Sequence, residues 1–251
     1  MVIRPRLAAP IALAVLAACR TPAPPAAIDR ALSERVPAAT VVLAGLDLDR
    51  VRASPLQAKL PAAGRAFLEP FGRAHYVLIA STGVELLTIA RGVVPGATQR
   101  APDLALSGAP NLIAAATAAH PPAGILAPAQ SVAATHPIWI AVRGGVALPL
   151  EGNLANINNL LRGTEYVTLG AEPGDPSNLE LVARCPTPDA ALRFEQSFRA
   201  LVSLAAAANA RQPAIAGMLQ SIRIGREERV VRVSLSAPLN ALAGYAAAEV
   251  Q

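Results

Sequence analysis

Hydrophobic and polar residues alternate along several short stretches of the chain, which is typical of β-strands with one buried face. In residues 178–185 nearly every second side chain is apolar, and residues 229–236 repeat this pattern. Residues 40–46 are almost continuously apolar, which predicts a strand buried on both faces. The predicted strands cover residues 40–46, 76–80, 84–90, 104–108, 137–143, 164–170, 178–185, 221–225 and 229–236.

Other stretches carry helix signals. Ser54 and Pro55 resemble an N-cap followed by proline in the first turn, and Thr187 opens the longest predicted helix in the same way. In that helix Phe194, Phe198 and Leu201 share one face at helical spacing. Further helices are predicted near residues 28–35, 111–120, 125–135 and 153–161, with loops at 96–101 and 121–122.

Short turn sequences join neighbouring strands into hairpins, with Gly83 available for a left-handed position in the first of them. The order strand, helix, hairpin, helix occurs twice along the chain. This order predicts an α+β protein with two similar lobes of mainly antiparallel sheet, each with helices packed on one face. The expected lobes are residues 38–120 and 121–251.

The first twenty residues have a different character. Arg4 and Arg6 precede an apolar run, residues 7–18, that is shorter than the ~20 residues needed to span a bilayer. The run ends in Leu16-Ala17-Ala18-Cys19, which resembles the lipobox of bacterial lipoproteins. The alternative is an ordinary signal peptide in which the cysteine is there by chance, cut at a nearby Ala-x-Ala-like site.

The resemblance implies that residues 1–18 are a signal peptide and that Cys19 becomes the first residue of the mature protein, carrying palmitate or similar acyl chains. Two or more chains give stable anchoring. The implied location is the periplasmic side of the bacterial cell envelope, and Arg20 favours the outer membrane over the inner one. Residues 19–37 are expected to be a proline-rich tether, which is extended over residues 21–27 and includes the short helix predicted near residues 28–35.

Composition narrows the function classes. The formal net charge is +5 and the sequence pI is about 10.0, but nearly all the basic residues are arginines dispersed among alanine and proline. Arginines and aromatic residues do not interleave, and aromatics make up only 3% of the chain. We therefore predict no nucleic-acid partner.

Residues that could carry chemistry are scattered. His75, His120 and His136 show no metal-ligand spacing, and nucleotide-binding or serine-hydrolase motifs are absent, so we predict no metal and no cofactor. Cys185 lies on the apolar side of its predicted strand. We interpret it as a buried, inert thiol, with a reactive or intermolecular thiol as the alternative.

Two further features are candidate sites. Asn153, Asn156 and Asn159 fall near one stripe of a predicted helix. We interpret the stripe as a polar helix face that includes an N-cap. The alternative is a ligand surface whose amides bind sugar hydroxyls or peptide backbone. Trp139, the only tryptophan, either packs between sheet and helices or lines a groove.

The sequence thus predicts a membrane-anchored envelope lipoprotein that acts as a binding or structural module and is not an enzyme. Its expected contacts are membrane lipid through acylated Cys19 and an envelope protein or cell-wall partner; no oligomeric state is predicted. One alternative is an envelope hydrolase that uses Asp47 or Asp49, although two carboxylates at a strand end more often cap a loop. Another is a carrier of a hydrophobic ligand, which requires an apolar cavity.

Overall fold

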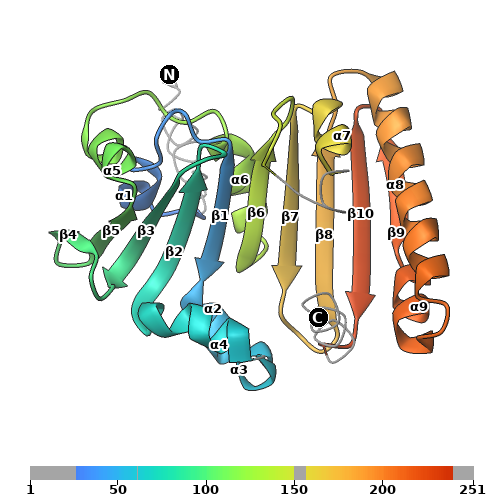
Figure 1. Cartoon of the computed structure of the whole chain (residues 1–251), viewed down its shortest axis with the longest axis horizontal. Coiled ribbons are helices and arrows are strands. Elements are labelled where there is room, and N and C mark those ends of the chain that lie inside the picture. Colours follow the sequence, from blue (N-terminus) through green and yellow to red (C-terminus); the bar gives the residue numbers. More distant parts are fainter. Residues whose placement is uncertain (1–26, 61, 150–156, 240–251) are drawn as a thin grey trace, which may run out of the picture.

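The computed structural model describes residues 27–60, 62–149 and 157–239 (Figure 1). Its helices are α1 (Arg30–Ser33), α2 (Leu48–Ala53), α3 (Leu56–Lys59), α4 (Ala62–Leu68), α5 (Pro110–Thr117), α6 (Leu126–Ala133), α7 (Ile157–Arg162), α8 (Pro188–Ala208) and α9 (Pro213–Gln220). Its strands are β1 (Val42–Asp47), β2 (Arg73–Ser81), β3 (Leu86–Val93), β4 (Thr98–Ala101), β5 (Leu104–Gly108), β6 (Ile138–Arg143), β7 (Tyr166–Glu172), β8 (Ser177–Arg184), β9 (Arg223–Glu227) and β10 (Val230–Ala237).

Within the described residues the strands form a single ten-stranded sheet in the order β4-β5-β3-β2-β1-β6-β7-β8-β10-β9. Every neighbouring pair is antiparallel. The α+β class and the antiparallel sheet are therefore confirmed. The strands of the two halves of the chain belong to the same sheet, because β1 pairs with β6 at its centre.

The two halves have the same strand succession. From the central seam outward, β1-β2-β3-β5-β4 corresponds to β6-β7-β8-β10-β9. The registers correspond as well. Tyr76-Val77 of β2 lies opposite Ala90-Arg91 of β3, and Tyr166-Val167 of β7 lies opposite Ala183-Arg184 of β8.

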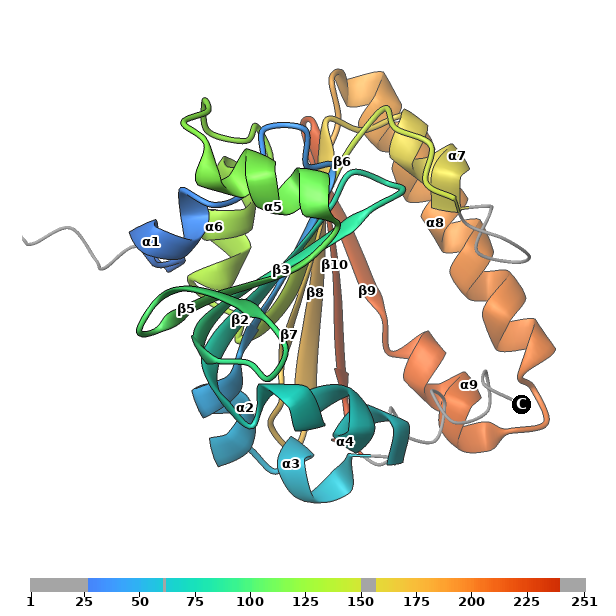
Figure 2. The same cartoon turned by 60° about the vertical axis from the view of Figure 1, so that its left-hand side comes forward.

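Helices cover both faces of the sheet, as Figure 2 shows, so the expectation of helices on one face only is wrong. Strand side chains alternate between the faces. On one face Leu78 and Ile89 pack with α1, α5 and α6, and we call this the α5 face. On the other face, the α8 face, β8 and β10 pack under α7 and α8. The α8 face of β2, β3 and β5 forms a separate cluster with α2 and Leu68 of α4.

The segment expected to be a tether is partly folded. Ile28, Leu32 and Val36 have no exposed surface and belong to the α5-face core. Their spacing of four residues places them on one side of the chain around α1, where the Asp29 side chain caps the helix by accepting a hydrogen bond from the Ala31 N–H at 2.7 Å. The folded body therefore includes residues 28–36.

Three elements were missed in the sequence. Residues 48–53, which follow the predicted strand at 40–46, form helix α2 with Asp47 as its N-cap. Residues 98–101, expected to be a loop, form the polar edge strand β4, which pairs with β5. Helix α9 begins at Pro213 and buries Ile215, Met218 and Leu219. That helix carries a recognisable signal, because proline in the first turn precedes apolar residues spaced by three and four.

Candidate functional site

A groove of about 940 Å³ lies between α1, the connection from α5 to α6, and α6 itself. We call it the α1–α6 groove. Much of its wall is formed by small residues, with Ala119, Ala123 and Gly124 in the connection. Small side chains leave the space open. The polar side chains that line it come from two parts of the chain, with Arg35 after α1 and with His120 and Gln130 within residues 117–130.

Arg35 is the half-buried cation of this groove. Its Nη1 donates a hydrogen bond to the Ala116 carbonyl near the end of α5, at 3.2 Å. The neighbouring Arg30 is paired with Glu34 at 2.6 Å on the exposed rim, and that hydrogen bond raises the pKa of the Arg30 guanidinium. Arg35 has no carboxylate partner among the described residues.

His120 brings an unsatisfied nitrogen to the same groove. Its Nδ1 lies 2.9 Å from the Pro121 carbonyl oxygen. Because a carbonyl only accepts hydrogen bonds, Nδ1 carries the proton in this contact. The other ring nitrogen, Nε2, is buried and has no partner within the described part of the chain. Buried polar atoms are usually paired, so this nitrogen marks a place where a ligand atom would complete a hydrogen bond.

A second, smaller hollow lies at the centre of the α8 face. It measures about 240 Å³ and is lined by Ala44, Leu46, Ile138, Ile140, Leu169 and Ala171, together with Gly45 and Trp139. We call it the central trough. Leu169 is 37% exposed there.

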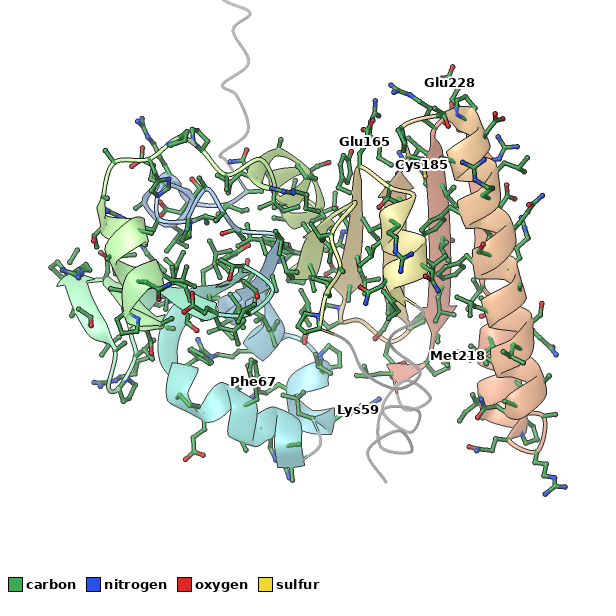
Figure 3. The ribbon with its side chains drawn as sticks, turned by 45° about the horizontal axis from the view of Figure 1, so that its top comes forward. Lys59, Phe67, Glu165, Cys185, Met218 and Glu228 are labelled. Carbon is green, nitrogen blue, oxygen red and sulfur yellow. The ribbon has the colours of Figure 1, made fainter. Side chains whose placement is uncertain are left out.

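Two ion pairs join the halves near the end of β7 that adjoins Ala171. Arg50 of α2 contacts Glu172 at 2.9 Å, and Lys59 of α3, labelled in Figure 3, contacts Asp175 at 2.9 Å. The Lys59 ammonium, with the Leu239 N–H, holds the pKa of the Asp175 carboxyl below its usual value. Both pairs are partly exposed, and their contribution to stability is therefore small.

Trp139 packs within the sheet region and does not stand free in a groove. It is 3% exposed, and its Nε1 donates to the Tyr76 hydroxyl at 2.8 Å. Burial raises the pKa of Tyr76 to about 12. The ring lies across the central seam over Gly45, where an added Cβ would come within 2.2 Å of the indole. Trp139 therefore belongs to the α5-face core, where it packs between sheet and helices.

The asparagine stripe is only partly within the described residues. Asn153 and Asn156 lie outside them, whereas Asn159 is exposed on α7 and borders two shallow hollows beside α8. The neighbouring Asn158 has a structural role, since its amide donates to the Leu148 carbonyl and accepts from the Leu148 N–H, both at 2.9 Å. Because the structure describes only Asn159 of the three, the asparagine stripe stays a prediction.

The other candidate residues have local partners. Asp47 caps α2 by accepting a hydrogen bond from the Arg50 N–H, and Asp49 contacts Arg52 and His75. Cys185, labelled in Figure 3, is free and buried in the core under α8, and burial raises the pKa of its thiol. This supports the interpretation of an inert thiol.

The described residues contain no group of three or more potential metal ligands. Among the helices that they form, none combines the length and apolarity that crossing a bilayer requires.

Comparison with known proteins defines the fold class. No family model matches the chain, and no curated protein matches it in sequence. Among solved structures the chain is similar to crystal form III of TP0453, with a TM-score of 0.52 and 9% identity over 87% of this chain and 98% of that one. Crystal form I of TP0453 gives a TM-score of 0.49 at 10% identity over 86% and 97%. At such identity the first similarity shows a shared fold, a mixed α+β arrangement with one large antiparallel sheet.

Proposed function

We propose that the protein is a lipid-anchored component of the bacterial cell envelope that binds a ligand or partner and is not an enzyme. Acylated Cys19 would hold the folded body at a membrane. The observation that carries the proposal is the position of the α1–α6 groove relative to the lipobox. Ala27, the first described residue, lies only eight positions after Cys19, and helix α1 lines the groove.

Covalent geometry limits how far the groove could lie from the bilayer. Eight residues span at most about 30 Å even when fully extended. An acylated Cys19 would therefore keep Ala27, three residues before α1, within that distance of the lipid head groups. Such a groove would suit a ligand or partner at the membrane surface.

Membrane fractionation tests the anchor. We expect the parent protein to sediment with membranes after washing in high salt, and the Cys19→Ala variant to leave the membrane pellet. Cys185→Ala is the matched control, because Cys185 is buried in the core far along the chain from the lipobox; it should sediment like the parent. A Cys19→Ala protein that remains with the washed membranes would contradict the proposal.

The central trough supports a second candidate function, carriage of a hydrophobic ligand. Apolar side chains line it, and part of Leu169 is exposed within it. We expect a fluorescent naphthylamine or fatty-acid probe to bind there, and Ala171→Phe to weaken that binding by filling the trough. The same probe affinity for parent and variant would remove this candidate.

The proposal also includes an internal duplication, with residues 38–120 and 121–251 as copies of one α+β lobe. Its support is the matching strand succession and the Tyr-Val and Ala-Arg pairs at corresponding registers. An experimental structure with a different register in either hairpin would contradict it.

A further inference from the structure

We propose that the α1–α6 groove binds a phosphate ester of a lipid head group, with Arg35 as its main donor. This inference rests on the proposed function, because the anchor at Cys19 is what would bring the groove to head groups. It adds the chemical class of the ligand, which neither the fold nor the lipobox implies.

The first argument is the state of Arg35. A guanidinium carries five N–H donors, and one of those of Arg35 is used on the Ala116 carbonyl. That hydrogen bond and the half-buried position of the side chain fix where the cation lies. With no carboxylate partner among the described residues, its remaining donors suit an anion. The planar guanidinium matches two oxygens of one phosphate group.

The second argument is His120. With the Nδ1 proton directed at the Pro121 carbonyl, Nε2 of the neutral ring accepts a hydrogen bond. A hydroxyl of a phosphorylated polyol supplies that donor.

The third argument is the balance of charge around the groove. Glu34 is the only carboxylate among the described residues that line it, and its charge is compensated by Arg30 at the rim. Arg35 is left as the uncompensated charge within the lining. Attraction between basic side chains and anionic head groups falls off within a Debye length of the membrane surface, and the link to Cys19 would allow the groove to approach that closely.

Binding by the unacylated chain tests the inference. The chain from residue 19 with Cys19→Ala is mixed with phosphatidylglycerol vesicles in a flotation assay and titrated separately with glycerol 3-phosphate and inorganic phosphate. We expect it to bind the vesicles, and glycerol 3-phosphate to compete for that binding. Adding Arg35→Gln should weaken vesicle binding about tenfold or more, as expected for the loss of a charged hydrogen bond.

Matched variants make the result specific. Arg211→Gln removes one exposed arginine outside the groove and should leave binding unchanged. Arg35→Lys keeps the charge but loses the two-pronged geometry, and should fall between parent and Arg35→Gln. His120→Gln provides a second groove variant if Arg35→Gln fails to fold, and should also weaken binding.

Equal vesicle binding by Arg35→Gln and Arg211→Gln would overturn the inference. Arg35-dependent binding of glycerol 3-phosphate or inorganic phosphate without vesicle binding would also overturn it, because the ligand would then be a free phosphate compound. The chain used carries no lipid, so these outcomes are independent of whether Cys19 is acylated in cells. Failure of the anchor in the fractionation experiment is therefore distinguishable from failure of the phosphate site.

Discussion

Replacing Trp139 with alanine is expected to lower the free energy of unfolding by about 3–5 kcal/mol, the usual cost of truncating a buried large aromatic residue. The ring is 3% exposed and lies over Gly45 at the seam where β1 and β6 join the two halves. Its loss leaves a cavity in the core and removes the donor to the Tyr76 hydroxyl. Urea unfolding followed by circular dichroism measures the change without relying on tryptophan fluorescence.

Trp139→Phe is the matched control for this substitution. It keeps most of the apolar ring and removes the Nε1 donor, so it should cost less than the alanine variant. Gly45→Ala approaches the same contact from the other strand and should destabilise by roughly 1–3 kcal/mol through overpacking. If the free energy of unfolding of Trp139→Ala lies within about 1 kcal/mol of the parent value, the ring does not stabilise the pairing of β1 and β6.

Leu32→Ala is expected to cost about 2–5 kcal/mol, as for other fully buried leucines. Leu32 has no exposed surface and contributes to the α5-face core from α1. A residue in a free tether would contribute almost nothing to stability. The same unfolding measurement therefore decides whether residues 28–36 belong to the folded body.

Leu204→Ala is the control for that experiment. Leu204 lies on α8 and is 68% exposed, so the same substitution should change stability by no more than about 0.5 kcal/mol. If Leu32→Ala and Leu204→Ala cost the same, α1 does not pack as described, and the α1–α6 groove loses one of its walls.

Much of the secondary structure could be predicted from the sequence because its signals are local. Alternation identified β8 and β10, and the proline-containing cap at Thr187 identified the start of α8. Strand β4 was missed because its residues are polar and exposed, and its pairing with β5 leaves no hydrophobic pattern.

The arrangement of the sheet could not be predicted in the same way. Alternation shows which residues of one strand share a face, but not which distant strand lies beside it. The central pairing joins residue 44 to residue 140, and no turn signal links segments so far apart. Two lobes were therefore expected where the described strands form one sheet, and both of its faces carry helices because the alternating side chains are apolar on both sides of the central strands.

Most of the α1–α6 groove could not be predicted from the sequence. Arg35, His120 and Gln130 come together through tertiary packing, and none has a motif around it. One signal was available, because Ile28, Leu32 and Val36 are spaced by four within the supposed tether and predict that the segment packs. Asn159 and Trp139 attracted attention by residue type, yet one is exposed beside α8 and the other is buried at the seam.

The central claim is that Cys19 carries lipid and holds the folded body at a membrane. Mass spectrometry of the N-terminal peptide, from protein purified out of bacterial membranes, tests this most directly. We predict a peptide that begins at residue 19, with a diacylglyceryl group on the thiol and an acylated amine. A peptide that begins elsewhere, or one with a free Cys19 thiol, would contradict the claim.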